Sequence, residues 1–394
     1  MVMNMNNKNW VSVWGNAVSI AEHHPEAYAK YITLRYPVYI PFDGDTLRFT
    51  FDNYCGSEAV TVTRATVSAA TSPVYEKMPL ACPCKKETIC DITFSKNESV
   101  TMEAHQTAVS DPVSFPVKKG MTLTVSLYFA DFTLMQSAVL VTGPLSKGFF
   151  SLGDQTHADA LPMDTTKTTN WFYFLSNIEL MTAEENHTVI CYGDSITAGA
   201  WPDYLTLLAR QNPDNHTAFI RRATSGSRVL RQYECITYDS YGLKGTNRFP
   251  HEIPTTGADT VIIQQGINDI IHPIGIETNP FRPMSDLPTA KELIDGYRYY
   301  IEEAKKLHLK VYMGTLLPIF GWRTYATFRD DLRNELNAWI RSAKEIDGCI
   351  DFDLALRGSE NPSAFREGFD SGDHLHPSSK AYKAMAECAY RVLK

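Results

Sequence analysis

The sequence predicts two parts of different fold class. Residues 1–184 are expected to form an antiparallel β-sandwich domain, and residues 185–394 an α/β three-layer sandwich with a parallel sheet. Short β-branched and aromatic runs dominate the chain up to about residue 180, whereas apolar strand-like runs alternate with helical patterns after it. A polar stretch at 182–187 separates the two patterns, and a length of 394 residues favours two domains over one.

The strands expected in the N-terminal part are rich in Val, Thr, Phe and Leu, and turn-forming stretches separate them. They lie at 47–51, 60–62, 100–102 and 123–129. Turns are indicated at 43–45 and 118–120. Short strands at such spacing are typical of an antiparallel sandwich.

In the C-terminal part, strand-like apolar runs alternate with segments of helical periodicity. Strands are expected at 188–192, 218–222, 260–264, 310–315 and 349–352, and helices at 202–211, 289–307, 328–346 and 378–393. Apolar strands interleaved with helices indicate a parallel sheet covered on both faces. Ligands of such sheets bind beyond the carboxyl ends of the strands, so chemistry-bearing residues are sought there.

Composition limits the function classes. A hydrophobic fraction of 44% and a charged fraction of 21% are those of an ordinary globular protein. A net charge of −8 argues against a general binder of nucleic acid or of anionic membranes, and no apolar run is long enough to cross a bilayer. Residues 1–10 contain no hydrophobic signal core, so we expect a cytoplasmic location unless a leader has been removed. Nothing here predicts the oligomeric state.

Three of the eight cysteines are closely spaced, at Cys82, Cys84 and Cys90. Thiolates at these positions could hold zinc, but the spacing is not that of a standard zinc finger. Free thiols, or one disulfide if the protein is exported, are favoured. We therefore predict no metal and no cofactor.

An apolar run at 189–192 ends in the tripeptide Gly-Asp-Ser, with the serine at Ser195. A serine between a strand end and a helix start exposes its hydroxyl, and its backbone N–H faces a site favourable to anions. This placement suits a nucleophile that attacks a carbonyl group. The alternative is a simple helix cap made by Ser195 or Thr197.

The tail of the chain carries Asp373 and His376 in a loop bounded by glycine and proline. A carboxylate three residues before a histidine can hold one ring nitrogen and leave the other free as a general base. Two other readings are open for this loop. It could be an ordinary surface loop, or Asp373, His374 and His376 could bind a metal.

Two further turns follow strand-like runs. Gly226 lies in the small-residue turn 224–227, where a glycine lets the backbone approach a ligand closely. Asn268 follows the buried-strand pattern 261–265, and its amide could donate a hydrogen bond at the strand end. Either could be an ordinary turn residue, but four such motifs at four successive strand ends favour one shared site.

These four blocks resemble those of the SGNH hydrolases, also called GDSL-type esterases. Ser195, Gly226, Asn268 and His376 match the four residues after which the family is named, and Asp373 matches the Asp of its Asp-x-x-His block. The resemblance covers about residue 188 to the C-terminus and is closest to two-domain, lysophospholipase-related members. One departure is Arg-Ala-Thr at 222–224, where the family often has Asn-x-Gly.

The resemblance implies a cofactor-free serine esterase. Ser195, Asp373 and His376 would form the catalytic triad, and the N–H groups of Ser195 and Gly226 with the Asn268 amide would form the oxyanion hole. The competing α/β-hydrolase reading fails, because the stretch 193–197 lacks the second glycine of a Gly-x-Ser-x-Gly elbow.

The substrate is expected to be a small-molecule or oligosaccharide ester, most simply an O-acetylated carbohydrate. Polar and aromatic residues flank the blocks, and Trp201, Arg228 and Trp322 are the candidate substrate-binding residues. One alternative is a lysophospholipase or thioesterase that accepts longer acyl chains. Another is a carbohydrate-binding protein with a degenerate hydrolase domain.

Overall fold

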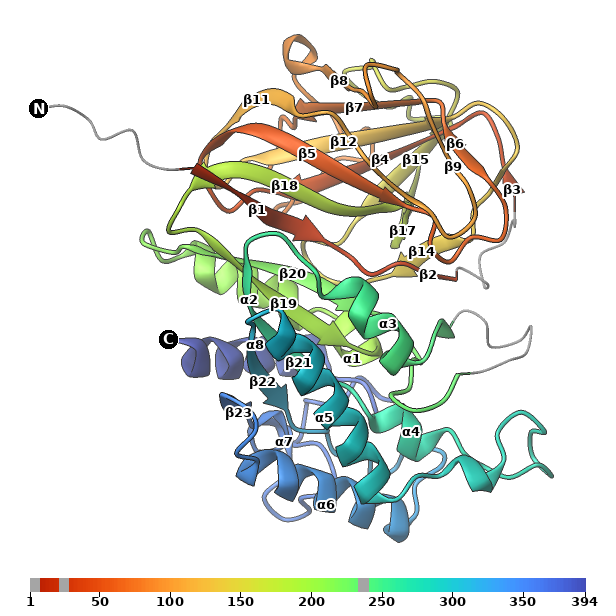
Figure 1. Ribbon diagram of the computed structural model, residues 1–394, viewed down its shortest axis with the longest axis vertical. Coiled ribbons are helices and arrows are strands. Elements are labelled where there is room, and N and C mark those ends of the chain that lie inside the picture. The colour runs from red at the N-terminus through yellow and green to blue at the C-terminus, as the bar shows by residue number, and fades with distance from the viewer. Residues whose placement is uncertain (1–7, 21–27, 233–240) are drawn as a thin grey trace, which may run out of the picture. The chain divides into compact units, whose positions relative to one another are not determined.

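A computed structural model describes residues 8–20, 28–232 and 241–394 (Figure 1). Residues 1–7, which belong to the stretch without a signal core, lie outside these ranges, as does Cys235. No helix within the described ranges is long and apolar enough to span a bilayer.

The chain divides into two compact units. The first consists of Met1–Thr188 together with Pro213–Ile220, and the second of Val189–Asn212 together with Arg221–Lys394. The short segment 213–220 thus leaves the second unit and returns to it, so each unit is built from two stretches of chain.

The first unit is built from antiparallel strands, as the sequence predicts. One sheet has the order β1-β18-β5-β10, with β11 also paired to β5, and another the order β16-β15-β4-β12-β7-β8. The strands are β1 (Lys8–Gly15), β2 (Ser19–Ile20), β3 (Tyr28–Ala29), β4 (Ile32–Tyr39), β5 (Gly44–Asp52), β6 (Val60–Val62), β7 (Arg64–Ala69), β8 (Cys90–Ile92), β9 (Val100–Met102), β10 (Thr107–Val109), β11 (Val113–Val117), β12 (Thr122–Phe129), β13 (Thr133–Leu134), β14 (Ser137–Leu140), β15 (Gly148–Leu152), β16 (Lys167–Thr169), β17 (Trp171–Tyr173) and β18 (Leu175–Ala183).

Burial in this unit follows the strand period. In β11 the side chains of Val113, Phe115 and Val117 are buried and the residues between them are exposed. The central strand β12 is buried along its whole length. Arg35 in β4 is buried among these strands, where Ser126 Oγ and the carbonyl oxygens of Cys82, Gln155 and Ala158 accept its hydrogen bonds.

The second unit contains a five-stranded parallel sheet with the order β20-β19-β21-β22-β23. Its strands are β19 (His187–Gly193), β20 (Thr217–Ala223), β21 (Ala258–Gln264), β22 (Lys310–Gly314) and β23 (Gly348–Ile350). The chain runs from β19 outward to β20 and then returns to the other side of β19. This reversal makes the carboxyl ends of β19 and β21 the topological switch point, the place where such sheets bind ligands.

The helices of this unit form two packed groups. One contains α2, α7 and α8, and the other α3, α4, α5 and α6. Their bounds are α1 (Ser195–Ala198), α2 (Trp201–Arg210), α3 (Gly245–Glu252), α4 (Ile267–Ile271), α5 (Ala290–Lys306), α6 (Thr327–Ser342), α7 (Phe352–Leu356) and α8 (Ser379–Leu393).

All five strands and four helices expected in this part are present, mostly to within two residues. Two boundaries differ. The strand expected to reach residue 352 ends at Ile350, because the Asp351 carboxylate accepts a hydrogen bond from Leu354 N and caps α7. The helix expected to reach residue 346 ends at Ser342, where Ala343 turns to an extended ψ of 130°. Helix α1 begins at Ser195, where a helix start was expected, whereas the short helices α3, α4 and α7 were not expected.

Candidate active site

Ser195 begins helix α1, one residue after the interior strand β19. Asp194 is the N-cap residue, and its side chain accepts a hydrogen bond from Ile196 N at 3.0 Å. The preceding residue must be glycine, because a Cβ atom at Gly193 would overlap the carbonyl oxygen of Gln264 in the neighbouring strand. The side chain of Ser195 remains partly exposed, while Asp194 and Ile196 are buried.

The loop before α8 brings a histidine to this serine. His376 Nε2 lies 2.9 Å from Ser195 Oγ, and His376 Nδ1 lies 2.6 Å from Asp373 Oδ2. The other carboxylate oxygen of Asp373 accepts backbone hydrogen bonds from Leu375 and His376 at 3.0 and 2.8 Å. The three side chains therefore form one hydrogen-bonded chain from carboxylate to hydroxyl.

The charge of Asp373 is well defined in this setting. Partial burial acts to raise its pKa, but the hydrogen bonds from the His376 ring, His376 N and Leu375 N outweigh this and lower the pKa to about 2. Asp373 is thus a carboxylate at neutral pH. A carboxylate on Nδ1 keeps that nitrogen protonated, which leaves Nε2 able to accept a proton.

Helix α8 is held against the serine turn by a close approach. A Cβ atom at Gly199, just after α1, would overlap the hydroxyl group of Tyr382 in α8. Tyr204 of α2 and Ser379 of α8 also share a hydrogen bond of 2.8 Å between their hydroxyl groups. These contacts fix the start of α8 and therefore the end of the loop that carries His376.

A second aspartate–histidine pair shapes the same loop. His374 Nδ1 lies 2.5 Å from Asp370 Oδ2, and Asp370 Oδ1 accepts hydrogen bonds from Gly372 N and His374 N. Gly372 and His374 both have positive φ values, 110° and 64°. His374 contacts the opposite loop at Gly321, where a Cβ atom would lie 2.8 Å from its ring. His374 therefore connects its own loop to the loop at Gly321, and its ring pairs with Asp370 and not with Ser195.

The predicted oxyanion residues lie at the ends of β20 and β21. Gly226 has a φ of 76°, a conformation that favours glycine, and Asn268 is in the first turn of α4 after Gly266. Asn268 Nδ2 donates a hydrogen bond of 3.1 Å to the carbonyl oxygen of Ser227 and keeps its second N–H. In the part of the chain that the structure describes, the backbone N–H groups of Ser195 and Gly226 donate no hydrogen bond.

Asp269, the residue after Asn268, is a positioning residue for which the sequence predicts no role. The Asp269 carboxylate accepts hydrogen bonds from Val229 N at 2.7 Å and Leu230 N at 3.0 Å. Gln265 Nε2 donates to Ser227 Oγ at 2.9 Å. Asp269 in α4 and Gln265 just before this helix thus hold the residues that follow Gly226. The Gly-x-Asn-Asp pattern was visible in the sequence, but its backbone partners were not.

Two buried carboxyl groups lie behind the serine. Burial raises the pKa of Asp194 to about 7 and that of Asp269 to about 6, although backbone hydrogen bonds and nearby arginines oppose this. Repulsion from the Asp269 carboxylate also raises the pKa of Asp194. Asp194 Oδ2 has no hydrogen-bond partner among the described residues.

The prediction that Trp201 binds substrate is wrong. Its side chain is 0% exposed, packs against the Phe352 ring at 5.5 Å and donates a hydrogen bond from Nε1 to Thr197 Oγ1. Trp201 begins α2, and its side chain lies in the core beneath the sheet edge. Its large apolar ring stabilises the core, and no substrate can reach it.

Arg228 is also buried, with 2% exposure, and its Nη1 lies 3.3 Å from Asp286 Oδ2. This ion pair ties the Gly226 turn to the loop after α4, so Arg228 does not present its guanidinium to solvent as predicted. Trp322 is partly exposed, and its Nε1 has no hydrogen-bond partner among the described residues. The substrate-binding role of Trp322 stays a prediction.

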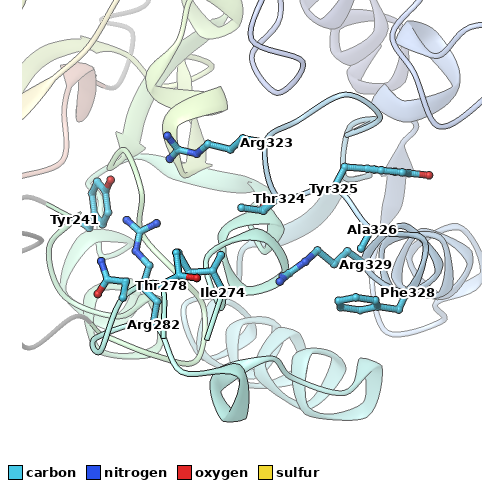
Figure 2. A pocket seen from close by; sticks show the side chains of 11 residues that line it. Tyr241, Ile274, Thr278, Arg282, Arg323, Thr324, Tyr325, Ala326, Phe328 and Arg329 are labelled. Atoms are coloured by element: carbon cyan, nitrogen blue, oxygen red, sulfur yellow. The ribbon is translucent and has the colours of Figure 1, made fainter. Parts of the chain in front are cut away.

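A cavity of about 860 Å³ opens at the carboxyl edge of the parallel sheet (Figure 2). The loops after β21 and β22 and the start of α6 form its walls. Its lining is polar and aromatic, and includes Tyr241, Arg282, Arg323 and Tyr325. Neither Ser195 nor His376 lines the cavity, so the cavity does not enclose the Ser195 hydroxyl group.

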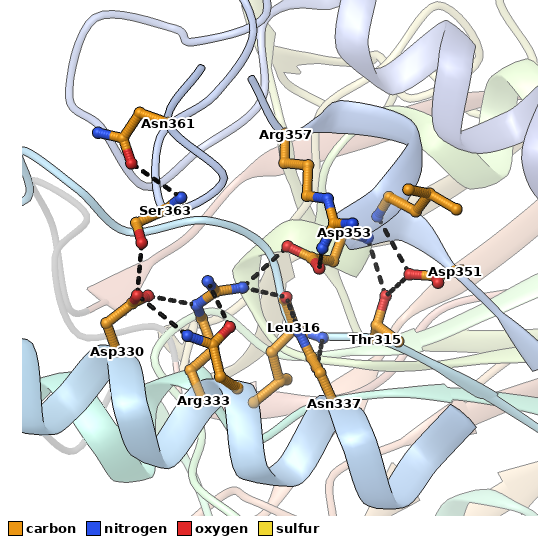
Figure 3. A network of polar contacts seen from close by, with 12 residues as sticks. Thr315, Leu316, Asp330, Arg333, Asn337, Asp351, Asp353, Arg357, Asn361 and Ser363 are labelled. Atoms are coloured by element: carbon orange, nitrogen blue, oxygen red, sulfur yellow. Dashed lines mark hydrogen bonds and ion pairs between the residues drawn. The ribbon is translucent and has the colours of Figure 1, made fainter. Parts of the chain in front are cut away.

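The loop between β22 and α6 is held by a buried polar network (Figure 3). Asn337 pairs with the backbone of Leu316 in both directions, accepting from its N–H at 2.7 Å and donating to its carbonyl oxygen at 2.8 Å. Arg333 donates to Leu316 O and to the carboxylates of Asp330 and Asp353. The base of the loop is therefore fixed by a fully paired cluster, which also fixes the cavity wall.

The clustered cysteines show free thiols in the described structure. Cys82 and Cys84 are buried, Cys90 is half-buried, and none of the three forms a disulfide. Burial raises the pKa of the Cys82 thiol to about 12, although Arg35 opposes this. Across residues 8–20, 28–232 and 241–394, no three His, Cys, Asp or Glu side chains gather in a way that could hold a metal ion.

Comparison with known proteins bears on the second unit. Residues 191–384 match the model of the GDSL-like lipase/acylhydrolase family. The second unit belongs to this family. It is therefore a carboxylic ester hydrolase unit, and the resemblance to the SGNH hydrolases is confirmed. No curated protein matches the sequence.

Similar solved structures of GDSL hydrolases cover about half of the chain. A GDSL-like lipase from Bacteroides thetaiotaomicron is 20% identical over 53% of this chain and 88% of its own, with a TM-score of 0.39. An acetyl xylan esterase from Geobacillus stearothermophilus is 17% identical over 53% and 96%, also with 0.39. A G-D-S-L family lipolytic protein from Veillonella parvula is 17% identical over 52% and 97%, with 0.35. At such similarity these structures say nothing about the substrate of this GDSL hydrolase unit.

Proposed function

We propose that the protein is a serine esterase that forms an acyl-enzyme on Ser195 and acts on short-chain esters, chiefly O-acetyl groups of carbohydrates. The observation that supports this most is the contact of 2.9 Å between Ser195 Oγ and His376 Nε2. It is the hydrogen bond that a nucleophile and its general base require. The hydrogen bond between Asp373 Oδ2 and His376 Nδ1 orients the base.

Acylation follows from this geometry. His376 Nε2 takes the proton of Ser195 as Oγ attacks the ester carbonyl carbon, and Asp373 stabilises the resulting imidazolium. The carbonyl oxygen becomes an oxyanion, which the N–H groups of Ser195 and Gly226 and the second N–H of Asn268 stabilise. When the carbon–oxygen bond to the alcohol breaks, His376 gives its proton to the leaving alkoxide.

Deacylation repeats these steps with water. His376 removes a proton from water as the water oxygen attacks the acyl-enzyme, the same donors stabilise the second oxyanion, and the carboxylic acid leaves as Ser195 regains its proton. The proposed sequence uses no metal or cofactor.

The proposal of an acetylated carbohydrate rests on the character of the adjoining cavity. Aromatic faces such as Tyr241 and Tyr325, with planar guanidinium donors beside them, suit sugar hydroxyl groups and rings. We propose that the alcohol part of the substrate occupies this cavity, while the acyl group remains at Ser195.

One observation favours the second candidate, an esterase for longer acyl chains. Five large apolar side chains are exposed in the two loops that border the cavity and at the start of α6, with exposures that reach 61% at Ile276 and 51% at Phe281. The five are Ile276, Phe281, Met284, Phe320 and Phe328. Exposed apolar groups around a catalytic cleft are what a lysophospholipase or thioesterase would use to contact an acyl chain.

A chain-length series of p-nitrophenyl esters separates the two candidates. If a groove accepted each added methylene, kcat/KM would rise by about fourfold per methylene, which corresponds to about 0.8 kcal/mol of apolar burial. We expect kcat/KM to fall after propionate instead, and acetate to be released from acetylated oligosaccharides. A maximum at octanoate would favour the second candidate.

A pair of variants sharpens this comparison. Under the second candidate Phe281→Ser would lower activity on octanoate but hardly on acetate. Leu354→Ser, which removes an equally exposed apolar side chain from α7, is the matched control. Under the first candidate neither variant would change the ratio of the two activities.

A further inference from the structure

The cavity beside the catalytic serine has a pronounced positive charge. Three of its lining residues are arginines, Arg282, Arg323 and Arg329, and none of its described lining residues is acidic. Figure 2 shows the side chains of Arg282 and Arg323 reaching toward Tyr241. A neutral sugar needs hydrogen-bond donors but no such concentration of fixed charge, so the proposed function leaves this feature unexplained.

Two of these arginines, Arg282 and Arg323, act on one buried group. Burial lowers the pKa of His272 well below its usual value, and the charges of Arg282, Arg228 and Arg323 lower it further. His272 stacks on Tyr241 with ring centroids 5.5 Å apart. His272 is therefore neutral at pH 7, and the charges of two lining arginines, Arg282 and Arg323, act on it.

Two of the three lining arginines, Arg329 and Arg323, differ in whether their guanidinium groups are bonded to other described residues. Arg329 donates hydrogen bonds to the carbonyl oxygens of Ile270 and Pro273 and so holds the cavity floor. Arg323 is exposed and lies over the Trp322 ring, with its guanidinium carbon 4.7 Å from the centroid. Within the described ranges no carboxylate forms an ion pair with Arg323. Arg323 is thus oriented by an aromatic face while its donors remain available.

The cavity is close to the proposed oxyanion hole. Its floor touches the last residues of α4, and Asn268 lies only about one turn, or about 5 Å, earlier in the same helix. Tyr241 packs against Gly226, where a Cβ atom would overlap its ring. On the other side, the loop with Arg323 contacts His374 through Gly321. The cavity therefore adjoins Gly226 through Tyr241 and α4 through Arg329.

We infer that this cavity binds an anionic substituent, a carboxylate or a phosphate, on the alcohol part of the ester substrate, with Arg323 as the accessible binding residue. A guanidinium matches the two oxygens of such a group with two parallel N–H donors, an arrangement that lysine cannot provide. Phe328 and Tyr325 would flank the remainder of the alcohol. The inference rests on the proposed function, because it assigns the substrate class of the same site.

The test compares three acetyl esters that differ in charge: acetylated glucose, acetylated glucuronic acid and acetylated glucose 6-phosphate. We expect the wild-type enzyme to prefer the charged esters over acetylated glucose by about tenfold or more in kcat/KM, the effect of one charge-assisted pair. This preference should weaken as KCl is raised, because salt screens an accessible ion pair. A preference for glucuronate or for phosphate identifies which anion the site takes.

Variants assign the preference to Arg323. Arg323→Gln should lower the ratio of kcat/KM for the charged ester to that for acetylated glucose by about tenfold. Arg298→Gln is the matched control, since it removes an equally exposed arginine from α5, where Arg298 pairs with Asp295 and Glu345. The control should keep the wild-type ratio. Equal ratios in the wild type and in Arg323→Gln would overturn the inference.

A binding measurement keeps the inference separate from the proposed function. In the Ser195→Ala protein, calorimetric titration with free glucuronate, glucose 6-phosphate and glucose tests the cavity without turnover. Binding of an anion but not of glucose, lost in Arg323→Gln, supports the inference even if no ester is hydrolysed. Binding of none of the three overturns it, even if p-nitrophenyl acetate is a good substrate.

Discussion

His376 Nε2 lies within 2.9 Å of Ser195 Oγ, although 181 positions separate the two residues in the chain. The contact exists because the carboxyl end of the interior strand β19 and the loop before the last helix meet at one edge of the sheet. Gly199 and Tyr382 maintain that meeting by close packing between the serine turn and α8. Activity should therefore depend on Ser195 and His376 and on the packing of Gly199 against Tyr382.

The nucleophile is tested first. Ser195→Ala should lower kcat/KM for p-nitrophenyl acetate by roughly 10⁶-fold, as the loss of the nucleophile does in serine hydrolases, and leave the melting temperature near that of the wild type. Ser342→Ala, on the exposed face of α6, is the control for removal of a serine hydroxyl. Substantial turnover by folded Ser195→Ala would show that another residue is acylated.

The oxyanion hole is tested at Asn268. Asn268→Ala should lower kcat by about 10²–10³-fold with a smaller effect on KM, the usual result of losing one donor. Because Asn268 also bonds to Ser227 O, part of any effect could come from the turn itself. Gln265→Ala removes another contact to Ser227 without removing a proposed donor, and its kcat should fall by much less. Equal losses in both variants would make Asn268 a positioning residue.

The packing between Gly199 and Tyr382 predicts a coupled effect on stability. The φ of Gly199 is −70°, so an alanine there meets no backbone strain, and Gly199→Ala tests the overlap with the Tyr382 side chain alone. Overpacking of this kind costs roughly 1–3 kcal/mol of unfolding free energy. In a Tyr382→Ala background the same change should cost much less, as a double-mutant cycle in urea would measure. Additive effects would contradict the packing described here.

The buried carboxyl group of Asp194 predicts a pH dependence of stability. Its pKa is about 7 in the folded protein and about 3.9 in the unfolded chain, so between these values the folded state binds more protons. Stability due to this group therefore falls as pH rises from about 4 to 7.

Asp194→Asn removes that titration and keeps an acceptor for Ile196 N. The free energy of unfolding of Asp194→Asn minus that of the wild type should therefore increase between pH 4 and pH 7, as measured by urea denaturation at each pH. A difference that stays constant over this range would show that Asp194 is ionised in the folded protein throughout.

Local patterns in the sequence determined much of this protein. The alternation of apolar runs with helical periods predicted all five strands of the parallel sheet, because a strand buried on both faces must be continuously apolar. The motifs predicted Ser195, Asp373 and His376 as neighbours, and in the structure the carboxyl end of β19 and the loop before α8 bring them together.

The roles of residues that act through partners distant in the sequence were determined only by the tertiary structure. Trp201 and Arg228 lie beside the motifs in sequence, yet both are buried, because whether a side chain near a strand end points to solvent or to the core depends on which helices cover it. Asp269 received its role from two N–H groups 40 and 39 positions away. The cavity likewise joins Tyr241, Arg282 and Arg323 from three separate loops. Sequence periodicity specifies which elements form, whereas burial and charge at a site arise from residues that only folding brings together.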